Sequence, residues 1–113
     1  MKILLDHCVP RRLARAIKSH QVLTTREMKW ELLRNGMLLR AAADAGFEAF
    51  ITTDRNLRFQ QNLSSLPLSV TVLISRSNSP EHLMPLAPLV TTTLEKIVPR
   101  TLIEIGSIGK QES

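Results

Sequence analysis

The stretch FEAFITTD, residues 47–54, decides the fold. It is rich in aromatic and β-branched residues and follows Gly46, which predicts a strand, and it ends in Asp54. A second apolar run, KILLD at residues 2–6, also ends in an aspartate, Asp6. Its apolar residues do not alternate with polar ones, which is typical of a parallel strand that is buried on both faces. The sequence therefore predicts two buried parallel strands that each end in a carboxylate.

Helices and strands are expected to alternate along the rest of the chain. Further strands are predicted over His20–Thr25, Leu68–Ile74 and, as an edge strand, Thr101–Ile105. Helices are predicted from Pro10, over Met37–Ala45, within Arg55–Leu63 and over Pro85–Val98, with Asn35-Gly36 and Ser75–Pro80 as breaks. This order predicts an α/β protein, a three-layer α/β/α sandwich with a mainly parallel sheet of four or five strands. Residues 1–105 are expected to form a single domain, and residues 106–113 a flexible C-terminal tail.

Size and composition narrow the functional classes. The chain has 113 residues and a formal net charge of +5, which suits one domain with a basic surface. Such a surface favours a polyanion such as RNA, although a solvated basic face is the alternative. The single cysteine, Cys8, cannot form an intramolecular disulfide, and the sequence has no signal peptide or apolar run of membrane-spanning length. We expect a cytoplasmic protein that has no membrane partner.

The two aspartates are the candidate catalytic residues. If their strands are neighbours, Asp6 and Asp54 lie at the same edge of the sheet, where carboxylates could together bind Mg²⁺ or Mn²⁺. Such an ion can activate water for attack on a phosphodiester. Glu27, just past the second strand, is the candidate third metal ligand, because Asp44 and Glu48 belong to the opposite end of the sheet. The alternative is that each aspartate only caps a helix or forms a turn.

Several polar and basic residues near the two aspartates are candidates for binding substrate. They could contact phosphate, sugar or base, but histidine and amide side chains in loops also commonly hydrogen-bond the backbone. The set consists of His7, Arg11, Arg55, Asn56, Gln60, Gln61 and Asn62.

Four motifs together resemble the PIN-like family of bacterial proteins, a branch of the PIN-domain nuclease superfamily that is related to VapC-type toxins. They are LLDHCVP (4–10), TTREMKWELLRNGMLL (24–39), FITTDRNLRFQQNL (50–63) and VTVLISRSN (70–78). The resemblance covers about residues 2–105. It implies a PIN-like fold and descent from ribonucleases that depend on Mg²⁺ or Mn²⁺.

Carried over by position, the resemblance assigns Asp6 and Asp54 as metal ligands. The sequence departs from the family at Met37, where relatives carry an acidic residue. The first hypothesis is therefore a metal-dependent ribonuclease that could be the toxin of a toxin–antitoxin pair, with an antitoxin protein as partner. The second is a catalytically degenerate module that binds RNA or protein. The third is an obligate homodimer that associates through the apolar segment Leu83–Val98.

Overall fold

The computed structural model describes residues 1–17 and 20–106. All five strands are parallel and form one sheet in the order β2-β1-β3-β4-β5, which confirms the α/β prediction. The strands are β1 (Lys2–Leu5), β2 (Gln21–Thr24), β3 (Ala49–Thr52), β4 (Ser69–Ile74) and β5 (Leu102–Gly106). The helices are α1 (Leu13–Ala16), α2 (Asn35–Asp44), α3 (Leu57–Gln60), α4 (Pro80–Leu83) and α5 (Ala87–Glu95), with 3₁₀ turns η1 (Leu63–Ser65) and η2 (Met84–Leu86).

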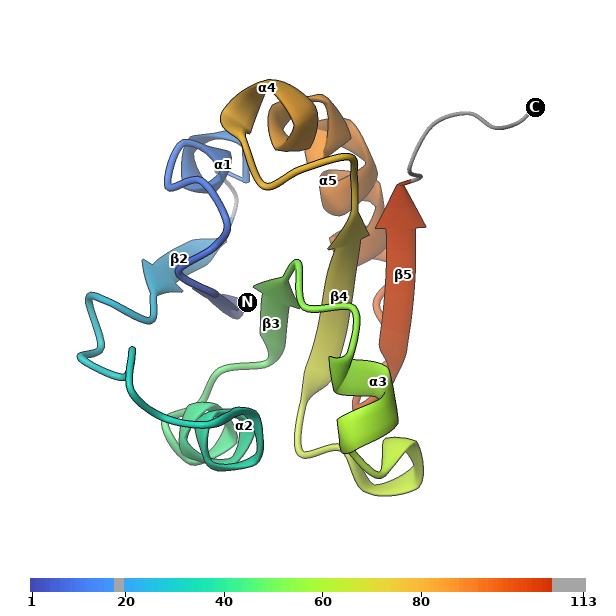
Figure 1. The fold of residues 1–113 in the computed structure, drawn as a ribbon. Coiled ribbons are helices and arrows are strands. Elements are labelled where there is room, and N and C mark those ends of the chain that lie inside the picture. The colour runs from blue at the N-terminus through green and yellow to red at the C-terminus, as the bar shows by residue number, and fades with distance from the viewer. Residues whose placement is uncertain (18–19, 107–113) are drawn as a thin grey trace.

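The helices cover both faces of the sheet. In Figure 1, α2 and α3 lie on one side of the strands, and α1, α4 and α5 lie on the other. The buried side chains divide in the same way because successive residues of a strand point to opposite faces. Ile3 and Leu5 of β1 pack with Leu13 of α1, whereas Leu4 packs with Leu38 of α2. The fold is the expected three-layer α/β/α sandwich.

The strand order reverses between β1 and β3. The chain passes from β1 to β2 on one side of β1 and then crosses back, so that β3 pairs with the other side. Leu5, the last residue of β1, is in register with Ile51, and the Asp6 N–H donates to the Ile51 carbonyl at 2.9 Å. In parallel α/β sheets, ligands bind at the carboxyl ends of the strands beside such a reversal. Asp6 and Asp54 follow these two strands.

The region after β4 differs from the prediction of one helix over Pro85–Val98. A helical turn already begins at Pro80, inside the predicted loop, and η2 separates it from α5, which ends at Glu95. Pro80 suits the first turn because its missing N–H has no helical partner there. Pro99 disfavours helical geometry at Val98, the residue before it, which opposes a helix that reaches the predicted end.

The ends of two other elements also differ from the expectation. Asn35 and Gly36 form the first turn of α2 and do not break the chain before it. Gly106 is the last residue of β5, so the predicted tail begins at least one residue later, and residues 107–113 lie outside the described part. In residues 1–17 and 20–106, every helix is too short or too polar to cross a bilayer.

Replacing Gly46 and Gly36 with alanine should change stability in opposite directions. Gly46 has φ +90° and closes the C-terminus of α2, where its N–H donates to the Ala43 carbonyl at 3.0 Å. A Cβ in this left-handed conformation costs energy, so Gly46→Ala should lower the free energy of unfolding by about 1 kcal/mol. Gly36 lies inside α2, and an added Cβ would meet only the Gln61 side chain at 3.8 Å. Gly36→Ala should therefore raise the free energy of unfolding by about 0.5 kcal/mol.

Urea denaturation followed by circular dichroism measures both changes. Each variant is the control for the other, because the same methyl group is added to the two ends of one helix. Equal changes in the two variants would contradict the described backbone at Gly46.

Candidate active site

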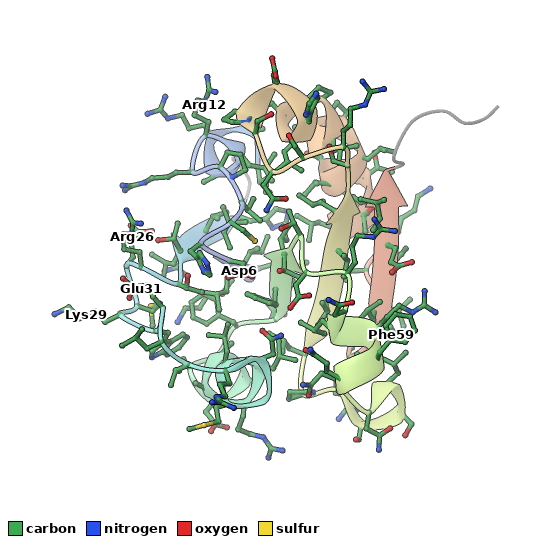
Figure 2. All side chains as sticks on the ribbon, viewed as in Figure 1. Asp6, Arg12, Arg26, Lys29, Glu31 and Phe59 are labelled. Atoms are coloured by element: carbon green, nitrogen blue, oxygen red, sulfur yellow. The ribbon has the colours of Figure 1, made fainter. Side chains whose placement is uncertain are left out.

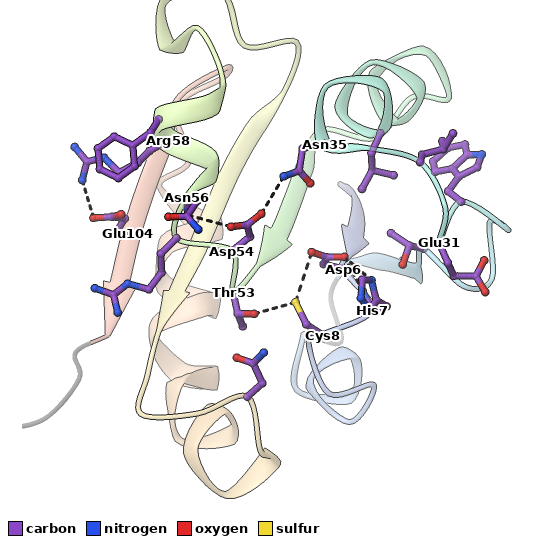
Figure 3. Close-up of a pocket in the computed structure, with 17 residues that line it drawn as sticks. Asp6, His7, Cys8, Glu31, Asn35, Thr53, Asp54, Asn56, Arg58 and Glu104 are labelled. Atoms are coloured by element: carbon purple, nitrogen blue, oxygen red, sulfur yellow. Dashed lines mark hydrogen bonds and ion pairs between the residues drawn. The ribbon is translucent and has the colours of Figure 1, made fainter.

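A cavity of about 760 Å³ opens at the carboxyl edge of the sheet, and both aspartates line it. Asp6 comes from the turn after β1 and Asp54 from the turn after β3 (Figure 3). Their strands are hydrogen-bonded neighbours, so the predicted meeting of the two residues at one edge is confirmed. Glu48 was predicted to lie at the other end of the sheet. This is confirmed, because the N–H of Glu48 donates to the carbonyl of Lys2, the first residue of β1.

Asp6 is buried and held in one orientation. The Thr52 hydroxyl donates to Asp6 Oδ2 at 2.7 Å, and the His7 N–H donates to Asp6 Oδ1 at 2.9 Å. His7 Nδ1 lies 3.1 Å from the same Oδ1. Cys8 Sγ also lies 3.5 Å from Oδ2, so each oxygen of the carboxylate faces two donors. A carboxylate has about four lone-pair sites, so a further ligand would replace one of the two longest contacts, which are those of Cys8 Sγ and His7 Nδ1.

Asp54 is linked to Asp6 through Thr52. The Asp54 N–H donates to Thr52 Oγ1 at 3.1 Å, while the same hydroxyl donates to Asp6. Asn35 Nδ2 donates to Asp54 Oδ2 at 2.9 Å, and the Asn56 N–H donates to Asp54 Oδ1 at 3.0 Å. The fully buried Thr52 therefore fixes the positions of both aspartates relative to each other. This explains why a threonine stands two residues before Asp54 in the sequence.

The oxygen donors suit a hydrated divalent cation. Mg²⁺ retains several of its waters and is commonly held by one or two carboxylates together with substrate phosphate. Thr25 also lines the cavity, and its buried hydroxyl lacks a hydrogen-bond partner among the described residues. A buried hydroxyl without a partner is unfavourable unless water or a ligand satisfies it. Asp6 and Asp54 are the residues that could hold the ion, with the Thr25 hydroxyl available to a water bound there.

Glu27 does not join the two aspartates. The Thr24 N–H donates to Glu27 Oε1 at 2.9 Å, and the Glu27 N–H donates to Thr24 Oγ1 at 3.1 Å, which is the reciprocal pattern of a capping box. The bond from the Thr24 backbone, with Arg11 nearby, lowers the pKa of Glu27. Glu27 lines a smaller cavity of about 380 Å³ with Asp6 but without Asp54.

The candidate metal site therefore has fewer carboxylates than the sequence suggested. Within the described ranges, no three His, Cys, Asp or Glu side chains are close enough to hold one ion. The expected ligand set of Asp6, Asp54 and Glu27 is thus reduced to the two aspartates, because the carboxylate of Glu27 closes the turn after β2.

The predicted substrate-binding residues are distributed over three adjoining cavities. His7, Arg55 and Asn56 line the main cavity, as expected for substrate contacts. Arg11 lies in the smaller cavity and is 3.5 Å from Glu27. Gln60 and Gln61 line a third cavity of about 440 Å³, which shares Leu33 and Asn35 with the main one.

Asn62 lies apart from this group and has a structural role. Its Oδ1 accepts the Ser64 N–H at 3.1 Å and so caps η1. The neighbouring amide side chains therefore have different partners. Gln60 Oε1 accepts a hydrogen bond from Asn35 Nδ2 at 3.1 Å, whereas Asn62 bonds the backbone two residues further along the chain.

Sequence analysis missed several residues that line the main cavity. Asn35 was assigned to a break, yet it contacts Asp54. An asparagine at the start of a helix, four residues before a buried leucine, only weakly indicates a side chain that faces the site. Glu104 lies on β5, far from the motifs in the sequence, and no local pattern identifies it. The missed residues are Glu31, Asn35, Arg58, Phe59 and Glu104.

Cys8 borders the cavity as a half-buried thiol. Thr53 Oγ1 donates to its sulfur at 2.9 Å. Burial, supported by the negative charge of Asp6, raises the pKa of Cys8 above its ordinary value of 9.0. The thiol is therefore protonated at neutral pH and is a poor nucleophile. The unfolded chain keeps the ordinary pKa of 9.0, so deprotonation of Cys8 favours the unfolded state only when the pH rises above this value. The free energy of unfolding should therefore fall on account of Cys8 only at alkaline pH.

Comparison of the chain with protein-family models, with curated proteins and with solved structures gives no match. The functional conclusion therefore rests on the residues at the carboxyl edge of the sheet.

Proposed function

We propose that the protein is a metal-dependent endoribonuclease of the PIN-like type. The observation that carries this proposal is the pair Asp6 and Asp54, which flank the reversal of strand order and open into one cavity. In the proposal these carboxylates hold Mg²⁺ or Mn²⁺. A bound ion of this kind lowers the pKa of water and stabilises charge on a phosphodiester.

The surrounding residues supply positioning and charge. Thr52 holds the carboxylate of Asp6 and the backbone of Asp54, and Asn35 restrains the carboxylate of Asp54 from the side of α2. Arg55 and the Asn56 amide group line the cavity and can hydrogen-bond phosphate oxygens. His7 Nδ1 is held by Asp6, which leaves Nε2 as the ring atom that can accept or donate a proton.

Basic side chains outside the cavity support a polyanionic substrate. Figure 2 shows Arg12, Arg26 and Lys29 projecting outward on the side of α1 and β2. All three are exposed. Arg26 also lines the smaller cavity, which shares Asp6 with the main one. RNA bound across Asp6 would therefore meet positive charge at this side, and its binding should weaken as salt increases.

A degenerate binding module is the second candidate function, and Met37 favours it. The side chain of Met37 is 65% exposed and provides no metal ligand where relatives carry an acid. A site with two carboxylates can bind Mg²⁺ only weakly before substrate phosphate joins it. The degenerate module would bind RNA in a salt-sensitive way without any dependence on divalent ions.

Calorimetric titration of Mg²⁺ and Mn²⁺, paired with a cleavage assay, separates the two functions. We expect saturable binding in the wild-type protein and none in the folded double variant Asp6→Asn/Asp54→Asn. We also expect cleavage of unstructured RNA only when the ion is present. RNA binding without cleavage in either metal would reject the nuclease and establish the binding module. If cleavage is found, growth arrest on expression that Asp6→Asn abolishes would support the toxin role.

A further inference from the structure

The aromatic residues are divided between the core and the proposed active site. The chain has three phenylalanines and one tryptophan, and no tyrosine. Phe47 and Phe50 are buried in the core beneath α2. Trp30 and Phe59 both line the main cavity. Trp30 also packs edge-on against Phe47 of the core, with 6.0 Å between the ring centroids, so Phe59 is the aromatic side chain of the cavity that stands mostly in solvent.

Phe59 is the more unusual of the two. Its side chain is 79% exposed, although removing a phenylalanine ring from water is worth about 1.5–3 kcal/mol. It lies on α3, and Arg55, in the turn just before this helix, lines the same cavity. Figure 2 shows Phe59 on the opposite side of Asp6 from Arg26 and Lys29. The ring therefore stands at the rim of the cavity, on the other side of Asp6 from the exposed basic residues Arg26 and Lys29.

An ion pair restrains the neighbourhood of this ring. The Arg58 guanidinium lies over the Phe59 ring, 5.3 Å from its centroid. Arg58 Nη1 is also 3.1 Å from Glu104 Oε1 on β5, and both residues line the cavity (Figure 3). At an exposed site a cation over an aromatic ring contributes about 0.5–1 kcal/mol of attraction. Glu104 thereby fixes Arg58 beside the ring, although most of the Phe59 surface stays open to solvent.

We propose that an unpaired nucleobase of the substrate stacks on Phe59 and positions the adjacent phosphate at Asp54. The inference rests on the proposed function, because it takes RNA as the ligand. A purine or pyrimidine ring covers an exposed aromatic face without a specific hydrogen-bond pattern, and such stacking is tolerant of sequence. Asn56 and Arg55, on the same segment, can contact the sugar and phosphate that follow the base.

The proposal limits the form of the substrate. A base in a duplex already stacks on its neighbours and is paired, so it can reach Phe59 only after it is flipped out. Loops and single strands present bases at no such cost. We therefore expect preference for RNA that is unpaired at this nucleotide, with little preference for which base it is.

Binding of short RNA in EDTA tests the inference without requiring cleavage. Trp30 is the only tryptophan and lies in the cavity, so its emission can report occupancy. The probes are one single-stranded RNA, the same RNA in a duplex, and the same strand with one abasic site. Phe59→Ala should weaken single-strand binding by at least about tenfold. Phe59→Tyr, which keeps the ring, should stay within about threefold of wild type.

Leu63→Ala is the matched control, because Leu63 is an exposed apolar residue just beyond α3 that does not line the cavity. It should bind the single strand as the wild type does. Equal binding of duplex and single strand, or equal affinities for Phe59→Ala and Leu63→Ala, would overturn the inference. If the protein binds as expected but never cleaves RNA with metal, the nuclease proposal fails and the stacking site stands.

Discussion

Asp6→Asn is expected to lower RNA cleavage by at least about 10³-fold while the protein stays folded. The substitution removes one of the two carboxylates that are proposed to hold the metal ion. Metal-ion stabilisation of a reacting phosphate is worth several kcal/mol, and a loss of about 4 kcal/mol corresponds to roughly 10³-fold in rate. Cleavage of single-stranded RNA in Mg²⁺ and in Mn²⁺ measures the effect.

The hydrogen bonds around Asp6 explain why the variant should fold. The amide oxygen can still accept the His7 N–H, which now donates to Oδ1. The amide NH₂ then faces Thr52 Oγ1 and Cys8 Sγ, both of which can accept a hydrogen bond. The buried Thr52 hydroxyl loses its acceptor on residue 6, which should cost about 1–3 kcal/mol and is less than the total stability of about 5–15 kcal/mol for a domain of this size.

Asp44→Asn is the control for the change in net charge. Asp44 is exposed at the last position of α2 and lines none of the three adjoining cavities. Since it alters the charge by the same amount, it should leave cleavage within about twofold of wild type, as expected when only general attraction to RNA changes. Full activity in Asp6→Asn would remove Asp6 from the mechanism.

Phe50→Ala is expected to lower the free energy of unfolding by about 3–5 kcal/mol. Phe50 is completely buried in β3 and lies between Leu4 of β1 and Val70 of β4. Removing the ring loses its transfer energy and leaves a cavity that neighbouring strands cannot easily fill. Domains of this size have a total stability of about 5–15 kcal/mol, so the variant should lose a large part of it. Urea denaturation followed by far-ultraviolet circular dichroism gives the value.

Phe59→Ala makes the same chemical change at an exposed position. Its ring is largely in solvent, so the loss in stability should be within about 0.5 kcal/mol. Comparing the two variants shows how much of the loss in stability comes from the burial of the ring and how much from the change of residue type. Similar losses in both would contradict the described packing of Phe50 and would also weaken the use of Phe59→Ala as a folded binding variant.

The parts of the fold predicted correctly are those encoded by local patterns. The apolar run of β1, the aromatic and β-branched residues of β3, and the Val, Thr and Ile content of β4 identified these strands, and Gly46 correctly marked the end of α2. The start of α4 was missed because Pro80 follows a serine-rich segment that also suits a loop. The long predicted helix over Pro85–Val98 was wrong in its bounds because two prolines and the pre-proline restriction divide and shorten it.

The candidate site was predicted in outline only. Asp6 and Asp54 could be placed together because each directly follows a buried strand and parallel strands align their carboxyl ends. The separation of Glu27 from Asp54 depends on a capping box that competes for its carboxylate. Asn35 reaches Asp54 only because α2 packs beside β3.

The sequence by itself determined the α/β alternation, the buried strands and the two carboxylates at their ends, because these depend on hydrophobic pattern and on single residues that directly follow it. Only the tertiary structure decided the strand order, the bridge that Thr52 makes between the aspartates, and the exposure of Phe59 at the cavity. Contacts such as Arg58 with Glu104 join residues 46 positions apart. Such a contact forms only when α3 and β5 are brought together by the fold, and no local pattern in the sequence predicts it.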